Sequence, residues 1–99
     1  MKIILTTDVF DKWFDKLRDN HAKARINARL RRASEDNLGD VKPVGEGVFE
    51  MRIHYGPGYR LYFMQKPLEL VILLVGGDKS TQTQDIESAL SLAKALKGE

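Results

Sequence analysis

The stretch GVFEMRIHYGPGYRLYFM, residues 47–64, decides the fold. Apolar and polar side chains alternate before and after its centre, which is the pattern of β-strands with two different faces. The central turn sequence, Tyr-Gly-Pro-Gly at residues 55–58, reverses the chain. These features predict two antiparallel strands that share a polar face. The side chains expected on that face are Glu50, Arg52, His54 and Arg60.

The flanking sequence predicts two further strands and three helices around this hairpin. Residues 2–6 form a short apolar run, and residues 70–75 are apolar at every position, as in a strand covered on both faces. Apolar residues at helical spacing predict three helices. The first begins at a cap on Thr7 or Asp8, and the others span about residues 22–35 and 83–96.

The expected order of elements is therefore β-α-α-β-β-β-α. Helices separated from a run of strands indicate an α+β fold, in which a helical hairpin packs on a mostly antiparallel sheet and a helix ends the chain. The chain of 99 residues has the length of one domain, residues 1–99, with no internal repeat or linker.

Composition excludes several classes of protein. The sequence has no cysteine, so neither a disulfide framework nor a thiolate metal site is expected. The longest apolar run, residues 70–75, is far shorter than the ~20 residues of a membrane span. The apolar start at residues 3–5 is too short for a signal peptide. We expect a cytoplasmic protein that does not bind membranes.

The expected second helix carries a basic cluster. No acidic residue lies between residues 21 and 32, whereas Arg25, Arg29 and Arg32 recur at helical spacing and Lys23 lies beside them. Such a cluster can bind nucleic acid or an acidic partner. An ordinary solvated helix face explains the same pattern, and the residues alone leave both interpretations open.

The polar face of the hairpin could carry chemistry on phosphate. Arg52 and Arg60 can bind a phosphate through two hydrogen bonds each and stabilise charge that develops on phosphorus, and Lys79 follows the last strand. His54 can move a proton near neutral pH, and Glu50 could act as a base or orient Arg52. A cross-strand ladder of salt bridges is the structural alternative.

Three tyrosines lie in or beside the hairpin. Tyr55, Tyr59 and Tyr62 could stack on RNA bases, although core packing explains at least one of them equally well. The sequence has only two histidines, His21 and His54, which are too few and too far apart to indicate a metal site. We expect neither a metal nor a cofactor.

Several longer strings resemble those of a known family. They are AKARINAR at residues 22–29, GDVKPVG at 39–45, GVFEMRIHYGPGYR at 47–60, and GGDKSTQ at 76–82 followed by Asp85-Ile86. The chain thereby resembles toxins of the RelE/ParE superfamily, in the HigB-like branch of addiction-module killer proteins, from about Thr7 to Leu96. The resemblance implies the compact RelE/ParE fold.

The resemblance also implies an activity and its residues. RelE-like toxins cut mRNA in the ribosome without a metal: the ribose 2′-hydroxyl attacks the adjacent phosphate, and the product carries a 5′-hydroxyl. Arg60 matches the strand arginine that contacts the scissile phosphate, Lys79 a second catalytic cation, and Arg52 a basic residue of the preceding strand. The chain lacks the late tyrosine or histidine of many ribonuclease members, so Glu50, His54 or a hairpin tyrosine must move the proton.

The family resemblance implies partners as well. These are a cognate antitoxin, usually a helix-turn-helix protein in this branch, together with mRNA and the ribosome, while operator DNA is reached only through the antitoxin. The basic cluster on the second helix would then dock on RNA. ParE-like members instead inhibit DNA gyrase by binding it, which requires no acid–base pair and is the alternative function.

Overall fold

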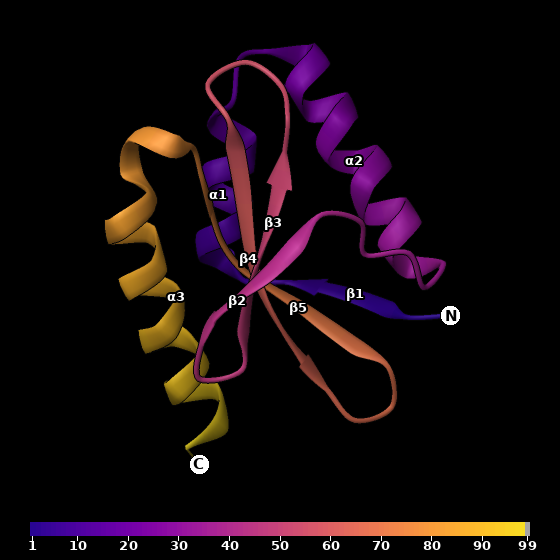
Figure 1. The fold of residues 1–99 in the computed structure, drawn as a ribbon, viewed down its shortest axis with the longest axis vertical. Coiled ribbons are helices and arrows are strands. Elements are labelled where there is room, and N and C mark those ends of the chain that lie inside the picture. Colours follow the sequence, from indigo (N-terminus) through magenta and orange to yellow (C-terminus); the bar gives the residue numbers. More distant parts are fainter. Residues whose placement is uncertain (99) are drawn as a thin grey trace.

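The computed structural model describes residues 1–98 and contains one sheet with helices on both of its faces (Figure 1). The first helix, α1, and the second, α2, run in opposite directions on one side, and α3 lies on the other. The elements in chain order are β1 (Ile3–Thr6), α1 (Asp8–Lys16), α2 (Asn20–Ser34), β2 (Val41–Gly45), β3 (Val48–Ile53), β4 (Tyr59–Lys66), β5 (Leu70–Gly77), the 3-10 turn η1 (Lys79–Thr81) and α3 (Gln82–Lys97).

The sheet has the strand order β1-β5-β4-β3-β2. Every neighbouring pair is antiparallel except β1 and β5, which are parallel. The expected α+β fold with a mostly antiparallel sheet is therefore confirmed. The apolar run predicted as a covered strand is β5, which lies inside the sheet and is buried along most of its length.

The sequence-based element order was wrong in one respect, because it lacked β2. This strand has the sequence VKPVG and pairs with β3 at the edge of the sheet. Pro43 cannot donate to a ladder and Gly45 interrupts it, so the stretch does not have the pattern of a strand. An edge position tolerates both residues, since one side of the strand needs no partner there.

Each face of the sheet has its own apolar core. The side chains between the sheet and the α1–α2 pair include Phe10, Ile26, Met51, Leu61 and Phe63. The core beneath α3 is smaller and is built from Val48, Tyr62, Met64, Leu74, Val75, Ala89 and Ala93. On the predicted polar face of the β3–β4 hairpin, α3 covers the part that holds Glu50 and Tyr62, which are both fully buried.

Side-chain caps start both α1 and α2, and the cap of α1 is one of the two that the sequence predicted. Thr7 Oγ1 accepts from the amide of Phe10 at 3.1 Å and donates to the carbonyl of Leu74 at 2.7 Å, so it caps α1 and fixes it to β5. Asp19 caps α2 by accepting from the amides of His21 and Ala22. These hydrogen bonds from backbone amides hold the pKa of Asp19 below its ordinary value, and the hydrogen bond from Ala22 contributes most.

Two glycines at the end of β5 let helices approach both faces of the sheet. A Cβ on Gly76 would lie 2.2 Å from the ring of Trp13 in α1. A Cβ on Gly77 would lie 1.8 Å from Oδ2 of Asp85 in α3. Both positions therefore exclude any larger residue unless the helices move.

Candidate functional site

Arg52 and Arg60 form a directly opposed pair across β3 and β4. In the same register Glu50 is opposite Tyr62, one pleat deeper in the sheet. All four side chains lie on the α3 side, as the alternation of the hairpin predicted. The Arg52 side chain is 37% exposed and the Arg60 side chain 12% exposed.

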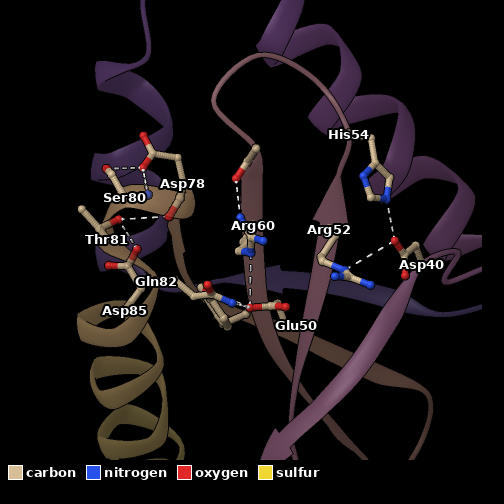
Figure 2. Close-up of polar contacts among 12 residues, drawn as sticks. Asp40, Glu50, Arg52, His54, Arg60, Asp78, Ser80, Thr81, Gln82 and Asp85 are labelled. Carbon is tan, nitrogen blue, oxygen red and sulfur yellow. Dashed lines mark hydrogen bonds and ion pairs between the residues drawn. The ribbon is translucent and has the colours of Figure 1, made fainter.

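Glu50 is fully buried, and its carboxylate organises the residues around it (Figure 2). Its Oε2 accepts from the Tyr62 hydroxyl at 3.1 Å and from Gln82 Nε2 at 2.9 Å, and it lies 3.5 Å from Arg60 Nε. Burial, reinforced by the nearby charge of Glu50, raises the pKa of Tyr62. The Tyr62 phenol therefore keeps its proton and donates a hydrogen bond to the Glu50 carboxylate.

The Arg60 guanidinium is held at a second point by the turn of its own hairpin. Its Nη1 donates to the carbonyl of Gly58 at 2.9 Å. The backbone amide of Lys79 donates to the carbonyl of Pro57 at 3.4 Å, which brings the start of η1 against the same turn. The Lys79 side chain is exposed there. This arrangement places two cationic side chains at one end of the sheet, with Arg60 fixed and Lys79 free.

The entry to α3 is built from a compact set of polar contacts beside Arg60 (Figure 2). Asp78 Oδ1 accepts from the amide and hydroxyl of Ser80, and the Thr81 hydroxyl donates to Asp85 Oδ2. Asp85 occupies the space left by Gly77, which is opposite Arg60 in the β4–β5 register. Burial raises the pKa of Asp85 above its ordinary value.

His54 lies apart from the Glu50–Arg60 contacts. It follows the last residue of β3, and its Nε2 is 2.6 Å from Asp40 Oδ2, an atom that is also 3.5 Å from Arg52 Nε (Figure 2). The hydrogen bond to His54 and the charge of Arg52 hold the pKa of Asp40 below its ordinary value. The polar side chains that were expected to converge thus form two groups, one around Glu50 and one around Asp40. Arg52 connects them, because it pairs with Asp40 and lies opposite Arg60.

Among the basic residues of α2, Arg29 is the one whose side chain is fixed by two hydrogen bonds. Its Nη1 donates to the carbonyl of Arg52, and its Nη2 donates to the carbonyl of Leu38 at 3.1 Å. Arg29 therefore joins α2 to β3 and to the loop before β2. Burial, together with the neighbouring charge of Arg32, lowers the pKa of Arg29.

The other candidate RNA-binding side chains on α2 remain nearer the surface. Lys23 Nζ lies 5.3 Å from the centre of the Phe14 ring, and the Arg25 guanidinium lies 4.6 Å from the centre of the Tyr55 ring. The Tyr55 hydroxyl donates to Asp19. Arg32 is exposed in the last turn of α2.

The three hairpin tyrosines differ in environment. Tyr59 is 8% exposed and packs edge-on against Trp13, and Tyr62 is fully buried under α3. Tyr55 is half-buried against Arg25. Core packing accounts for Tyr59 and Tyr62, and Tyr55 keeps the greatest access to solvent.

Two residues of this region do not stand out in the sequence. Gln82 has the pattern of a helix start and Asp40 that of a loop, yet they contact Glu50 and His54 respectively. The one signal for Gln82 is its place in the string GGDKSTQ.

Residues 1–98 contain no group of three or more His, Asp or Glu side chains arranged to hold a metal ion. No helix in that range is long and apolar enough to cross a membrane.

Comparisons with known proteins agree with this fold. The family model of the phage-derived Gp49-like proteins matches residues 10–97. An uncharacterized protein of Haemophilus influenzae is 53% identical over 93 residues, which covers 94% of each chain. An arginine-to-alanine double mutant of the E. coli toxin RelE superposes with a TM-score of 0.73 at 15% identity, over 93% of this chain and 96% of that one.

A second solved structure shows the same architecture. A chain of the toxin–antitoxin complex RelBE2 from Mycobacterium tuberculosis superposes with a TM-score of 0.64 at 20% identity. The match covers 79% of this chain and 98% of that one. At these identities the likeness shows the fold, which is therefore the RelE-like fold expected from the sequence.

Proposed function

This chain belongs to the Gp49-like family of phage-derived proteins, and on that premise we propose that it is the toxin of a type II toxin–antitoxin pair. Its fold is shared with a protein described as the E. coli toxin RelE and with a chain of a toxin–antitoxin complex. The activity we propose is cleavage of mRNA on the ribosome. The strings at residues 22–29, 39–45, 47–60 and 76–82 favour the HigB-like branch of these toxins.

The observation that carries the proposal is the fixed cationic site at Arg60. Arg60 is held by Glu50 and by the carbonyl of Gly58, Arg52 lies directly opposite it, and Lys79 projects from the adjoining turn. A preorganised guanidinium stabilises the charge that develops on a phosphate under attack, because it need not reorganise during the reaction. Arg52, Arg60 and Lys79 are the residues we assign to the scissile phosphate.

Proton transfer is assigned to His54 in preference to Glu50. Glu50 is fully buried, and its Oε2 already faces three donor groups, so it serves to position Arg60. His54 is exposed, and Asp40 engages its Nε2, which orients the ring and leaves Nδ1 to exchange a proton. In the reaction the 2′-oxygen bonds to phosphorus as its proton passes to His54, and the bond from phosphorus to the 5′-oxygen breaks. The protonated imidazole or water returns a proton to the 5′-oxygen, which leaves as a hydroxyl.

The proposed function includes partners. A helix-turn-helix antitoxin would neutralise the chain and link it to operator DNA, and the target mRNA would be reached in the ribosome in the cytoplasm. Lys23, Arg25 and Arg32 lie on α2, where they can meet RNA, and Tyr55 offers an accessible ring. No metal or cofactor is assigned to the reaction, since Arg and Lys side chains supply the positive charge.

Primer extension after brief induction of the chain without antitoxin tests this proposal. A long cellular transcript is examined with its start codon intact and with its start codon removed. We expect cuts only in the translated transcript. Cuts in both would remove the dependence on the ribosome, and growth arrest with both transcripts intact would contradict the ribonuclease assignment.

The burial of Glu50 favours a second candidate function, binding inhibition of DNA gyrase. Glu50 is the only carboxylate among the predicted catalytic residues, and it is fully buried with its Oε2 hydrogen-bonded to Tyr62 and Gln82, so no solvent-accessible carboxylate serves as a base at Arg60. Inhibition by binding needs none. Growth arrest accompanied by DNA damage, with intact transcripts, would support this function.

A further inference from the structure

A basic hollow lies between α2 and the end of β3, at some remove from Glu50 and Gln82. It has a volume of about 320 Å³ and is lined by Arg25, Ala28, Arg29, Arg32, Ile53 and His54. Three guanidinium groups and an imidazole thus surround an apolar floor. Figure 2 shows His54 at this side of the sheet, next to α2.

No carboxylate lines the hollow to balance these charges. Asp40 is the nearest acidic group on the facing loop, and its Oδ2 is already 2.6 Å from His54 Nε2 and 3.5 Å from Arg52 Nε. Burial, and after it the charge of Arg32, lowers the pKa of Arg29, while the charge of Asp40 acts in the opposite direction. The guanidinium groups of Arg29 and Arg32 both border the hollow and carry like charges that repel each other. A bound anion would relieve that repulsion.

The walls of the hollow are held in place before any ligand arrives. Arg29 is fixed by the carbonyls of Arg52 and Leu38, and the Arg25 guanidinium lies over the Tyr55 ring. Within residues 1–98 the guanidinium of Arg32 makes no ion pair and no hydrogen bond. Arg25 and Arg32 therefore keep their donors available for an oxyanion, with little ordering cost at Arg25.

We propose that this hollow binds a backbone phosphate of single-stranded RNA other than the scissile one. The inference rests on the proposed function and adds a second anchoring point to it. Guanidinium forks match the oxygens of a phosphodiester, and Arg25 and Arg32 supply two of them from one helix face. The anchor would hold the RNA strand while Arg60 engages the phosphate that reacts.

Repeating negative charge favours RNA over an acidic protein segment. His54 lies two residues beyond Arg52, about 7 Å along an extended chain, and Arg52 is opposite Arg60. The hollow and the Arg60 site are thus the two ends of one line of cations. A nucleic acid strand carries a charge on every residue and can engage the whole line.

The test measures binding and involves no cleavage. A fluorescent 2′-O-methylated RNA strand, which cannot react because its 2′-hydroxyls are blocked, is titrated with wild type, Arg32→Glu and Arg31→Glu. The two variants reverse one exposed charge each on the same helix, and Arg31 does not line the hollow. We expect Arg32→Glu to bind about tenfold more weakly than Arg31→Glu.

Salt dependence and NMR give independent measurements. The slope of log K against log salt is negative, and its magnitude should fall by about 0.7 in Arg32→Glu, because this variant neutralises one phosphate fewer. Inorganic phosphate should shift the NMR signals of Ala28, Ile53 and His54 in wild type and leave them in place in Arg32→Glu. Circular dichroism of both variants checks that they are folded.

Three outcomes would overturn the inference. These are equal RNA affinity of Arg32→Glu and Arg31→Glu, no shift of the hollow's signals with phosphate, or binding of a polyglutamate peptide to the hollow more tightly than RNA. The proposed function fails separately: a chain that binds the blocked RNA through the hollow but leaves translated transcripts intact would keep this inference and lose the ribonuclease assignment.

Discussion

Arg60 Nε lies 3.5 Å from Oε2 of Glu50, and this carboxylate is fully buried beneath α3. The guanidinium that we assign to phosphate is thus held from below by a negative charge that solvent does not reach. Tyr62 and Gln82 donate to the same oxygen, so β4 and α3 both converge on the support of one arginine. This contact links the stability of the fold to the geometry of the site.

Glu50→Gln should therefore destabilise the protein and loosen Arg60. It leaves Arg60 largely buried with no opposite charge, and breaking a buried pair from one side costs about 3 kcal/mol. Urea unfolding of the variant measures this destabilisation. Glu87→Gln, an exposed position on α3, is the matched control and should change stability little. Equal unfolding midpoints for the two variants would contradict the supporting role of Glu50.

Gly77→Ala should displace the start of α3. The added Cβ would lie 1.8 Å from Asp85 Oδ2 and 2.9 Å from Thr81 Oγ1, so the Asp85 side chain or the start of the helix must move, at a cost of about 1–3 kcal/mol. Removing the obstructing side chain in the double variant Gly77→Ala/Asp85→Ala should restore part of that stability. A double-mutant cycle on unfolding free energies measures the coupling. Additive effects of the two substitutions would show that Gly77 and Asp85 are not in contact.

Asp40 should contribute stability that depends on pH in the acid range. Its pKa in the folded protein is held below the ordinary value of 3.8, chiefly by the hydrogen bond with His54. The contribution of ionised Asp40 is therefore complete above 3.8 and is lost as the pH falls through the lower folded-state value. Urea unfolding of wild type and Asp40→Asn at a series of pH values checks this.

The stability difference between wild type and Asp40→Asn should shrink as the pH falls through that range. Asp15→Asn, an exposed carboxylate on α1, is the control and should follow wild type throughout. A difference that stays constant down to strongly acidic pH would mean that Asp40 acts through its shape and not through its charge.

The hairpin at residues 47–64 was predictable because strand alternation and one turn determine it. A period of two places Arg52 and Arg60 on one face whatever surrounds them, and the register confirms that they are opposed. The cap at Thr7 was predictable for the same reason, because it depends on hydrogen bonding within one helical turn. Such features depend on residues close together in the sequence.

The burial of Glu50 was not predictable from the hairpin. Gln82 contacts Glu50 from 32 residues away, and the close approach of α3 to the sheet depends on Gly77 at the end of β5. His54 was expected beside Arg60, but it lies just beyond the end of β3, where Asp40 holds it. Pro43 and Gly45 made β2 difficult to predict, because a strand tolerates such residues at the edge of a sheet, and that position is not visible in the sequence.

The single-turnover rate of mRNA cleavage on programmed ribosomes tests the central claim most directly. Wild type is compared with Arg60→Ala and with Arg18→Ala, a control that removes an exposed arginine between α1 and α2. Loss of a preorganised donor to the transition state lowers a rate by about 100- to 1,000-fold, so Arg60→Ala should lose that much while Arg18→Ala cleaves normally. Cleavage by Arg60→Ala at the wild-type rate would contradict the assignment of Arg60 to the reacting phosphate.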